Sequence, residues 1–452
     1  MNLATTELLE PGRTTPVFGE FETVVVGGGP AGIAAAVASA RAGRSTVLVE
    51  RYGFLGGAGT AAGLSTFCGL HANVHGDIRR VVHGIADEIL DRLDRMGGLN
   101  APHPSFQGLT HAQAYDISAY KIVADEMLLG AGVRIVFHAL AVGVAMRSPR
   151  TIDAVIVESK SGRAALRGRI FIDCSGDADI AAWAGAPFEK GTDAETLLFP
   201  STMFRINGVD PSRADLSGLN IARLMADAEE RENFRFPRRV PIVRPQKNPI
   251  EWRANVTQVR NPDDSPVDGT DVAQMTYGEI EGRRQIWRFF EFLRDSVPGF
   301  DKSYIVEIAP QLGIRETRRV VGTYQLSEDD ILGCADFPDS IGVNGWPVER
   351  HVLGDVVIRW QGVPHSRGFN QLPYRMIVPR EVDNLLVAGR CASMTHDGQS
   401  SARVSGPCFV MGQAAGTAAD MAIAAAAPVG AIDVPTLQRR LRADGAFLGE
   451  GS

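Results

Sequence analysis

Three glycines near the N-terminus have the spacing of a nucleotide-binding turn. Gly27, Gly29 and Gly32 fit the pattern G-x-G-x-x-G, in which the first glycine allows a tight turn and the second lets a pyrophosphate approach the backbone. The third glycine allows a helix to pack closely on a strand, and the start of that helix attracts phosphate through free N–H groups and a positive dipole. Glu50 follows at roughly the separation, about 20 residues, at which a carboxylate binds a ribose hydroxyl. The spacing therefore predicts a bound adenine dinucleotide.

Three arginines in the second half of the chain form another group that could do chemistry. Arg315, Arg318 and Arg319 fall within residues 308–322, which we expect to be a strand. In a strand, Arg315 and Arg319 would share one face, and Arg318 would point to the other. One face could then bind a substrate carboxylate through two parallel hydrogen bonds. The alternative is a structural salt bridge with an acid such as Glu316.

The elements around the glycine motif predict a βαβ unit. A run of β-branched residues precedes Gly27, an alanine-rich helical stretch follows it, and a second strand ends at Glu50. Alternation of apolar runs with helical patterns continues along the chain and indicates an α/β fold. We expect further helices and strands at residues 84–93, 116–129, 133–137, 139–144, 152–158 and 169–173.

Two further features favour FAD over NAD as the dinucleotide. Residues 51–60 form a second glycine-rich loop directly after the second strand, at the sheet edge where ligands lie in open α/β sheets. This extra bare backbone suggests a cofactor longer than a nucleotide. A strand ending in glycine returns at residues 383–389 and leads to a small-residue helix at 412–419. Such a return suits a flavoprotein whose chain leaves for a substrate domain and comes back to complete the cofactor cleft.

Composition limits the class of protein. The chain has 452 residues, enough for two or three domain-sized units, and a net charge of −7 disfavours broad binding to nucleic acid or anionic membranes. No apolar run reaches the roughly 18 residues that a membrane span needs. Five cysteines without a C-x-x-C pair indicate reduced thiols in a cytoplasmic protein. His71, His75 and His83 lack an accompanying acid or cysteine pattern, so we expect no metal site.

Four motifs in order resemble the FAD-dependent oxidoreductases with a glutathione-reductase-like fold. The motifs lie at Glu50–Gly57, Ile172–Asp179, Gly313–Arg319 and Asn384–His396. The resemblance covers residues 20–190 and 305–450. It implies an α/β fold in which a Rossmann-like FAD-binding domain carries an inserted α+β substrate or cap domain.

The chain is divided accordingly into four parts. Residues 191–300 lose the glycine-rich rhythm and carry clusters of proline, arginine and aromatic residues, as expected of an insertion. The predicted parts are an N-terminal arm at 1–20, the first part of the FAD-binding domain at 21–190, the substrate or cap domain at 191–374, and the returning part of the FAD-binding domain with C-terminal helices at 375–452.

The resemblance also implies which residues hold FAD. They lie in the glycine loops and at strand ends: Gly27, Gly29, Pro30, Ala31, Gly32, Glu50, Arg51, Gly56, Gly57, Asp177, Gly389 and Arg390. For Asp177, capping of the following helix is the alternative. Related fumarate-reductase-like flavoproteins can bind FAD covalently through a histidine before the second glycine loop. Residues 51–55 contain no histidine, so we expect noncovalent FAD.

The same resemblance places His396 in a loop beside the isoalloxazine ring. Histidine titrates near neutral pH and can accept a hydroxyl or amine proton as hydride leaves the substrate. The alternative is that His396 only hydrogen-bonds the flavin pyrimidine ring. Arg403 could neutralise the charge at N1 of the reduced flavin or hold a substrate anion. Together with Arg315 and Arg318, these two residues form the candidate catalytic set.

These features predict an FAD-dependent dehydrogenase or oxidase that moves hydride from a small polar or anionic substrate to flavin N5. The alternatives are a reductase of an activated C=C bond, a flavin monooxygenase, and a flavoprotein that only carries electrons. The halogenase pattern GWxWxIP does not occur. A separate electron acceptor is expected, either oxygen, a quinone or a redox protein, and a homo-oligomer is compatible with the sequence.

Overall fold

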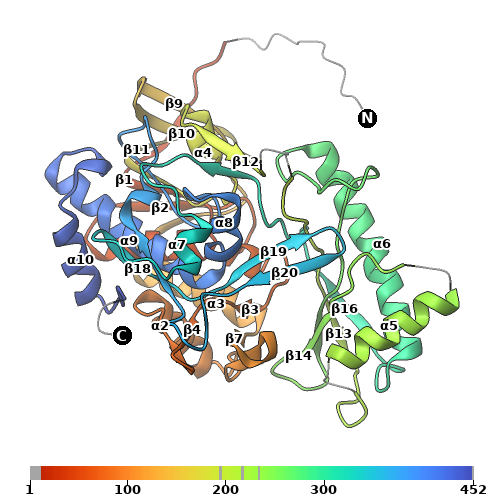
Figure 1. Cartoon of the computed structure of the whole chain (residues 1–452). Coiled ribbons are helices and arrows are strands. Elements are labelled where there is room, and N and C mark those ends of the chain that lie inside the picture. The colour runs from red at the N-terminus through yellow and green to blue at the C-terminus, as the bar shows by residue number, and fades with distance from the viewer. Residues whose placement is uncertain (1–11, 193–195, 215–217, 233–234, 450–452) are drawn as a thin grey trace.

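The computed structural model describes residues 12–192, 196–214, 218–232 and 235–449. Its central element is a seven-stranded sheet with the order β8-β2-β1-β11-β10-β9, in which β22 also pairs with β11 (Figure 1). The strands are β1 (Val17–Val26), β2 (Thr46–Val49), β8 (Arg134–Val136), β9 (Leu140–Ser148), β10 (Thr151–Ser159), β11 (Gly162–Asp173) and β22 (Leu385–Val387).

The βαβ unit predicted around the glycine motif is confirmed. β1 and β2 pair in parallel with Val25 opposite Leu48, and β2 pairs in parallel with β8. β1 begins at Val17, so residues 17–20 belong to the sheet and not to the predicted N-terminal arm, because Val17 already pairs with Ala165 of β11. Residues 1–11 of that arm lie outside the described residues.

β11 is the strand at which the two distant parts of the chain meet. Its first half pairs antiparallel with β10. Its last three residues pair in parallel with β22, with Phe171 opposite Leu385 and Asp173 opposite Val387. The strand predicted at 383–389 therefore returns to the same sheet, and the carboxyl ends of β1, β2, β11 and β22 share one edge.

Helices α1 (Pro30–Arg41) and α9 (Ser405–Ala425) pack against each other over this sheet. The close approach depends on glycine: a Cβ at Gly412 would overlap the carbonyl oxygen of Ala31, and one at Gly416 would overlap that of Ala35. α9 begins seven residues before the predicted helix at 412–419 and continues beyond it. By length and composition it could cross a membrane, but 78% of its apolar window is buried within the fold.

A second sheet lies apart from the first, with the order β14-β15-β13-β16. Helices α5 and α6 accompany it on the right of Figure 1, and its aromatic core, which includes Trp252, Phe289 and Phe300, is separate from the core under α1. Its elements are β13 (Phe204–Asn207), α5 (Gly218–Glu232), β14 (Ile242–Pro245), β15 (Trp252–Asn255), α6 (Val272–Ser296) and β16 (Tyr304–Ile308). Phe234, which belonged to an aromatic cluster noted in the insertion, lies outside the described residues.

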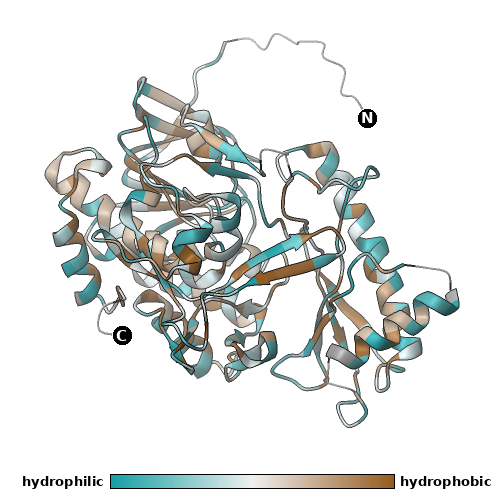
Figure 2. Ribbon diagram, viewed as in Figure 1, coloured by the Kyte–Doolittle hydropathy of each residue, from teal (hydrophilic) through white to brown (hydrophobic). Residues whose placement is uncertain are grey.

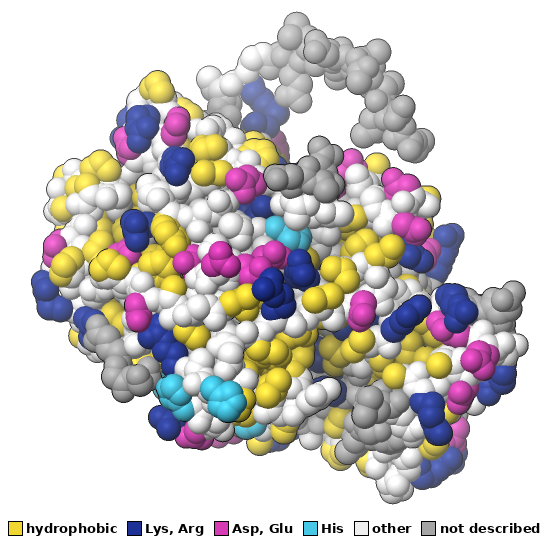
Figure 3. Space-filling model, in the orientation of Figure 1, with side chains coloured by type: hydrophobic (Ala, Val, Ile, Leu, Met, Phe, Trp, Pro, Cys, Tyr) yellow, Lys and Arg dark blue, Asp and Glu magenta, His cyan; other side chains and the backbone are white. Residues whose placement is uncertain are grey.

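Shorter elements connect the two sheets, and hydrophilic segments lie on the outside of both regions (Figure 2). On the face shown in Figure 3, acidic and basic side chains are interspersed.

The remaining helices are α2 (Ile85–Arg95), α3 (Ile117–Gly130), α4 (Asp179–Trp183), α7 (Glu328–Leu332), α8 (His396–Ala402) and α10 (Val434–Ala443). The 3-10 turns are Gly57–Gly59, Phe106–Gly108, Tyr374–Ile377 and Val429–Ala431. The remaining strands are β3 (Thr66–Phe67), β4 (His71–Val74), β5 (Asp77–Arg80), β6 (His103–Ser105), β7 (Thr110–Ala114), β12 (Phe188–Lys190), β17 (Arg318–Val320), β18 (Ser340–Asn344), β19 (Val348–Val352), β20 (Asp355–Arg359) and β21 (Asn370–Pro373).

The single strand expected at 308–322 is wrong. β16 ends at Ile308, and β17 covers only Arg318–Val320. Pro310 interrupts the segment because proline has no N–H to donate to a strand partner, and Gly313 makes only an isolated bridge to Ser201. Arg315 lies in this irregular stretch, so it does not share a strand face with Arg319.

Candidate functional site

A cavity lies at the carboxyl ends of β1, β2, β11 and β22, where open α/β sheets bind their ligands. Most of the residues predicted to hold FAD line it: Gly27, Gly29, Pro30, Ala31, Glu50, Arg51, Gly57, Asp177, Gly389 and Arg390. Gly32 and Gly56 are outside its lining. Of the four candidate catalytic residues, Arg403 lines the cavity, while His396, Arg315 and Arg318 are outside its lining.

The first glycine loop has the backbone that the motif requires. Gly27 has φ +101°, a conformation in which a side chain would be strained. A Cβ at Gly32 would overlap the carbonyl oxygen of Gly27, so this glycine allows α1 to start directly on the turn. Gly29 precedes α1 without a side-chain cap, and Pro30 occupies the first helical position. The free N–H groups of α1 therefore face the cavity, as an anion-binding helix start requires.

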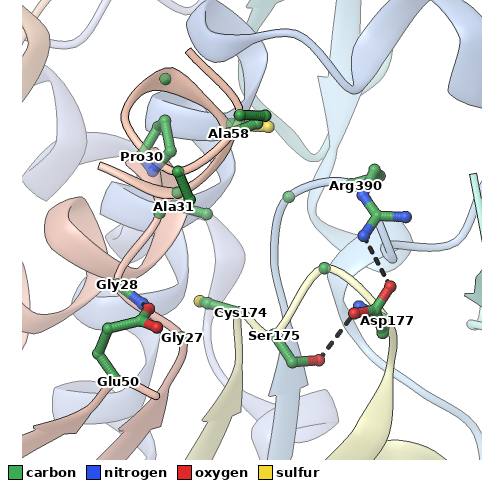
Figure 4. Close-up of a pocket in the computed structure, with 18 of the residues that line it drawn as sticks. Gly27, Gly28, Pro30, Ala31, Glu50, Ala58, Cys174, Ser175, Asp177 and Arg390 are labelled. Carbon is green, nitrogen blue, oxygen red and sulfur yellow. Dashed lines mark hydrogen bonds and ion pairs between the residues drawn. The ribbon is translucent and has the colours of Figure 1, made fainter. Parts of the chain in front are cut away.

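Glu50 is fixed at the rim of this loop. Its Oε2 accepts from the backbone N–H of Gly28 at 2.7 Å, and its Oε1 accepts from the N–H of Tyr52 at 3.0 Å. Figure 4 shows the carboxylate beside Gly28. Each carboxylate oxygen has a second lone pair, so the held side chain can still accept a hydrogen bond from a ribose hydroxyl.

The second glycine loop packs on the first. The N–H of Gly56 donates to the carbonyl oxygen of Gly28 at 2.8 Å, and Gly56 has φ +109°. Gly57 lies against Gly29, where a Cβ on Gly57 would approach the Cα of Gly29 to 2.8 Å. Bare backbone from both loops therefore lines one stretch of the cavity.

Asp177 and Arg390 close the opposite side of the cavity (Figure 4). Nη2 of Arg390 lies 2.7 Å from Oδ1 of Asp177, which also accepts from Thr317 Oγ1 at 2.8 Å. Burial opposes ionisation of Asp177, but the charge and hydrogen bond of Arg390 outweigh it and lower the pKa of the carboxyl. Capping of α4 by Asp177, the alternative, is wrong because the capping residue is Ala178 and no side chain caps the helix.

Arg318 is engaged in a structural pair beside this cavity. Its Nη2 contacts the carboxylate of Asp179, and its Nε donates to the carbonyl oxygen of Asp177 at 2.6 Å. Burial, followed by the charges of Asp177 and Asp173, raises the pKa of Asp179 to about 7, although Arg318 favours the ionised form. Asp179 itself lines the cavity.

Arg315 and Arg319 are held in the interior. Arg315 donates to the carbonyl oxygen of Phe199 at 2.5 Å and to Ser201 Oγ at 2.9 Å. Burial, followed by the charge of Arg403, lowers the pKa of the Arg315 guanidinium. Arg319 pairs with the buried carboxylate of Glu316. These contacts fit the structural alternative for this group of arginines.

His396 is the first residue of α8, after the capping residue Thr395. Its Nδ1 lies 2.9 Å from the carboxylate of Glu316, which is fully buried. This bond fixes the orientation of the imidazole and leaves Nε2 as the nitrogen that can exchange a proton. The role of His396 as a base stays a prediction.

One end of the cavity is formed by residues that no sequence motif had indicated. Leu64, Thr66, Phe67 and Tyr115 form this wall, and the rings of Phe67 and Tyr115 have centroids 4.2 Å apart. Both aromatic residues are buried, and burial raises the pKa of the Tyr115 hydroxyl well above its ordinary value. The phenol is therefore a neutral hydrogen-bond donor.

The start of α9 completes this end. Val404, its capping residue, and Ser405 line the cavity beside Arg403. Val404 provides no side-chain cap, so the positive end of the helix dipole is directed toward the cavity wall. Pro407 in the first turn is a helix-start signal that could have revealed this beginning in the sequence.

Comparison with known proteins gives a family and remote structural likenesses. A family model described as FAD dependent oxidoreductase matches residues 22–441. The chain is similar, at 14% identity and a TM-score of 0.49, to a geranylgeranyl bacteriochlorophyll reductase-like protein from Thermoplasma acidophilum, with 94% of this chain and 82% of that chain covered. It is also similar, at 14% identity and a TM-score of 0.47, to p-nitrophenol 4-monooxygenase from Pseudomonas putida DLL-E4, with 96% and 90% covered. A search of curated proteins gave no significant match.

Proposed function

The protein belongs to the FAD-dependent oxidoreductase family, and we propose that it is a dehydrogenase or oxidase of the glutathione-reductase-like type. In this proposal, a small polar substrate gives up hydride to noncovalently bound FAD, and a separate acceptor such as oxygen, a quinone or a redox protein reoxidises the flavin. All five cysteines are free, which supports a cytoplasmic location.

The residues present fit FAD. The two glycine loops and the open start of α1 would hold the pyrophosphate. Glu50, anchored by two backbone N–H groups, would bind the ribose. Asp177 and Arg390 offer a carboxylate and a guanidinium to the rest of the cofactor. When bound, the flavin supplies a two-electron acceptor for hydride.

One observation carries the proposal: a single cavity runs from the dinucleotide loops to the wall of Phe67, Tyr115 and Arg403. The aromatic wall excludes water, which strengthens electrostatic interactions within the site. Arg403 and the start of α9 bring positive charge to the same end. A polar substrate can therefore be oriented beside the cofactor.

Proton transfer is assigned to the pair of His396 and Glu316. The buried carboxylate holds Nδ1 of the imidazole, so that Nε2 can accept the hydroxyl or amine proton as hydride leaves. Glu316 also stabilises the imidazolium that results. The chain thus contributes cofactor binding, substrate orientation and a base.

An anaerobic substrate screen tests this function. Holoprotein is mixed with hydroxy acids, amines and polyols, and the flavin absorbance is followed before oxygen is admitted. We expect bleaching by at least one class; fast reoxidation with peroxide would then indicate an oxidase, and slow reoxidation a dehydrogenase. Bleaching only by NAD(P)H, followed by insertion of oxygen into a substrate, would overturn the proposal in favour of a monooxygenase. Net reduction of an activated C=C bond would favour the reductase.

A further inference from the structure

Three arginines lie side by side across the second sheet. Arg244 of β14 is directly opposite Arg253 of β15, which in turn is directly opposite Arg205 of β13. Side chains at directly opposite positions point to the same face, and like charges there are destabilising. Such a row therefore needs negative charge to compensate it.

The row is compensated at one end only. Arg205 lies 2.7 Å from Glu251 and 3.0 Å from Glu307, so its charge is neutralised twice. Among the described residues, neither Arg253 nor Arg244 has a carboxylate within ion-pair distance. Arg244 is half-buried and donates to the carbonyl oxygen of Pro104 at 3.3 Å.

Arg253 leaves one edge of its guanidinium unused. Nη1 donates to the carbonyl oxygen of Leu64 at 2.5 Å, whereas Nε is buried and has no hydrogen-bond partner. The residue is only 5% exposed. Burial, with the charge of Arg244 adding to it, lowers the pKa of Arg253 to about 10, so the group remains a cation at neutral pH. Nε and the adjacent Nη2 form the fork that binds a carboxylate through two parallel bonds.

Arg253 and Arg244 are outside the lining of the cofactor cavity, but Arg253 is joined to the substrate end of that cavity by its hydrogen bond to a lining residue. Leu64, which accepts from Arg253, lines that cavity, as do Tyr115 and Arg403. Burial raises the pKa of the Cys68 thiol to about 12, and the positive charges of Arg253, Arg403 and Arg244 oppose that rise. The acid facing the same thiol is Glu349, whose carboxylate is already bonded to Trp346 at 2.9 Å and to His351 at 3.2 Å.

We infer that Arg253 and Arg244, together with Arg403, form an anion-binding subsite that selects a substrate carrying a carboxylate. The inference rests on the proposed function and specifies its substrate class. The sequence placed the anion site at Arg315 and Arg318, but both are held by protein groups. The proposed site lies instead at arginines of the second sheet. The unused edge of Arg253 would bind the carboxylate, and Arg244 and Arg403 would supply further positive charge.

A spectroscopic titration of the holoprotein tests the subsite without a known substrate. Oxalate, which cannot donate hydride, is added while the visible flavin spectrum is recorded, with inorganic phosphate and neutral glycerol in parallel. We expect a saturable spectral change with oxalate and none with glycerol. Saturable binding of phosphate but not oxalate would overturn the carboxylate assignment, and no saturable binding of either anion would overturn the subsite.

Variants then locate the binding. Arg253→Gln is expected to raise the oxalate Kd at least tenfold, because a charge-assisted pair of hydrogen bonds is lost. Arg205→Gln is the matched control, since it removes the neighbouring arginine that is already paired, and its oxalate Kd should stay within about twofold. Arg253→Lys keeps the charge but loses the fork, so its Kd should lie between the two. Equal Kd values in wild type and Arg253→Gln would overturn the inference.

A second variant is available in case the first does not fold. If Arg253→Gln does not fold, Arg244→Gln at the half-buried position replaces it, with an expected rise in Kd of about threefold or more and no rise as the contradicting result. The subsite and the proposed function can also fail separately. Hydride transfer from neutral alcohols alone would leave the function and remove the subsite, while oxalate binding without any hydride donor would do the reverse.

Discussion

The cofactor end and the substrate end of the cavity treat charge differently. At the cofactor end, each ionised side chain has a partner in the protein: Glu50 is bonded to backbone N–H groups, and Asp177 is paired with Arg390. Next to the substrate end, outside the cavity lining, Arg253 is buried with an unpartnered Nε. Buried charges are costly unless paired. The charges at the cofactor end are therefore satisfied within the protein, whereas the arginine beside the substrate end retains donors for an anion.

The largest effect is expected where the cofactor loop has no free space. In Gly32→Val, the new side chain would overlap the carbonyl oxygen of Gly27, so the turn must open. We expect FAD binding to be lost and the free energy of unfolding to fall by about 1–3 kcal/mol or more. FAD content per chain and thermal unfolding measure this. Gly143→Ala, at a glycine of β9 with nothing within 4 Å of the new Cβ, is the control that should retain FAD; a Gly32→Val protein with full FAD content would refute the account of the loop.

The next effect tests the proposed base, His396. His396→Asn keeps an N–H that can donate to Glu316 but lacks the second ring nitrogen. We expect flavin reduction by a donor substrate to slow by roughly 100-fold to 10,000-fold, the usual range for general base catalysis. FAD content should stay unchanged. Stopped-flow reduction measures the rate, and an unchanged rate would remove His396 from the mechanism.

A smaller effect is expected from breaking the charge pair at the cofactor end. In Asp177→Asn, Arg390 loses its ionised partner, and the free energy of unfolding should fall by about 1–3 kcal/mol. Asp383→Asn is the matched control, because its pair with Arg150 is largely exposed and should contribute less to stability. Denaturant unfolding of both variants compares them. Equal losses of unfolding free energy in the two variants would show that the Asp177–Arg390 pair contributes no more to stability than the exposed pair.

A pH dependence of stability is expected from Asp179 at the cofactor end. Its pKa of about 7 in the folded protein exceeds the ordinary value of 3.8, so the folded state binds more protons than the unfolded state between these values. The contribution of this group to stability is therefore greatest below pH 4 and declines as pH rises toward 7. In Asp179→Asn, the free energy of unfolding should depend less on pH in that window. An unchanged slope would contradict the assignment.

The cofactor end could be predicted from sequence because its determinants are local. Gly27, Gly29, Gly32 and Glu50 lie within one βαβ unit, so their spacing alone fixes their juxtaposition. The returning strand was also predictable, since an apolar run ending at Gly389 has few other interpretations. The structure confirms both the unit and the return.

The substrate end could not be predicted because its determinants are not local. Arg253 faces Arg244 and Arg205 only through strand register, which the chain does not encode in any short window. The prediction of one strand over 308–322 was wrong because Pro310 breaks the pairing. Arg315 was therefore assigned to a substrate face, although the structure bonds it to Phe199 and Ser201.

The most direct test of the central claim, that one cavity joins a complete cofactor end to an anion-selecting substrate end, is anaerobic flavin reduction by matched donors. Each 2-hydroxy acid is compared with the 1,2-diol in which the carboxylate becomes a neutral CH₂OH group. In wild type, an acid is expected to bleach the flavin at least tenfold faster than its diol, and Arg253→Gln is expected to reduce this preference. Equal rates for acid and diol, or a preference that survives in Arg253→Gln, would contradict the central claim.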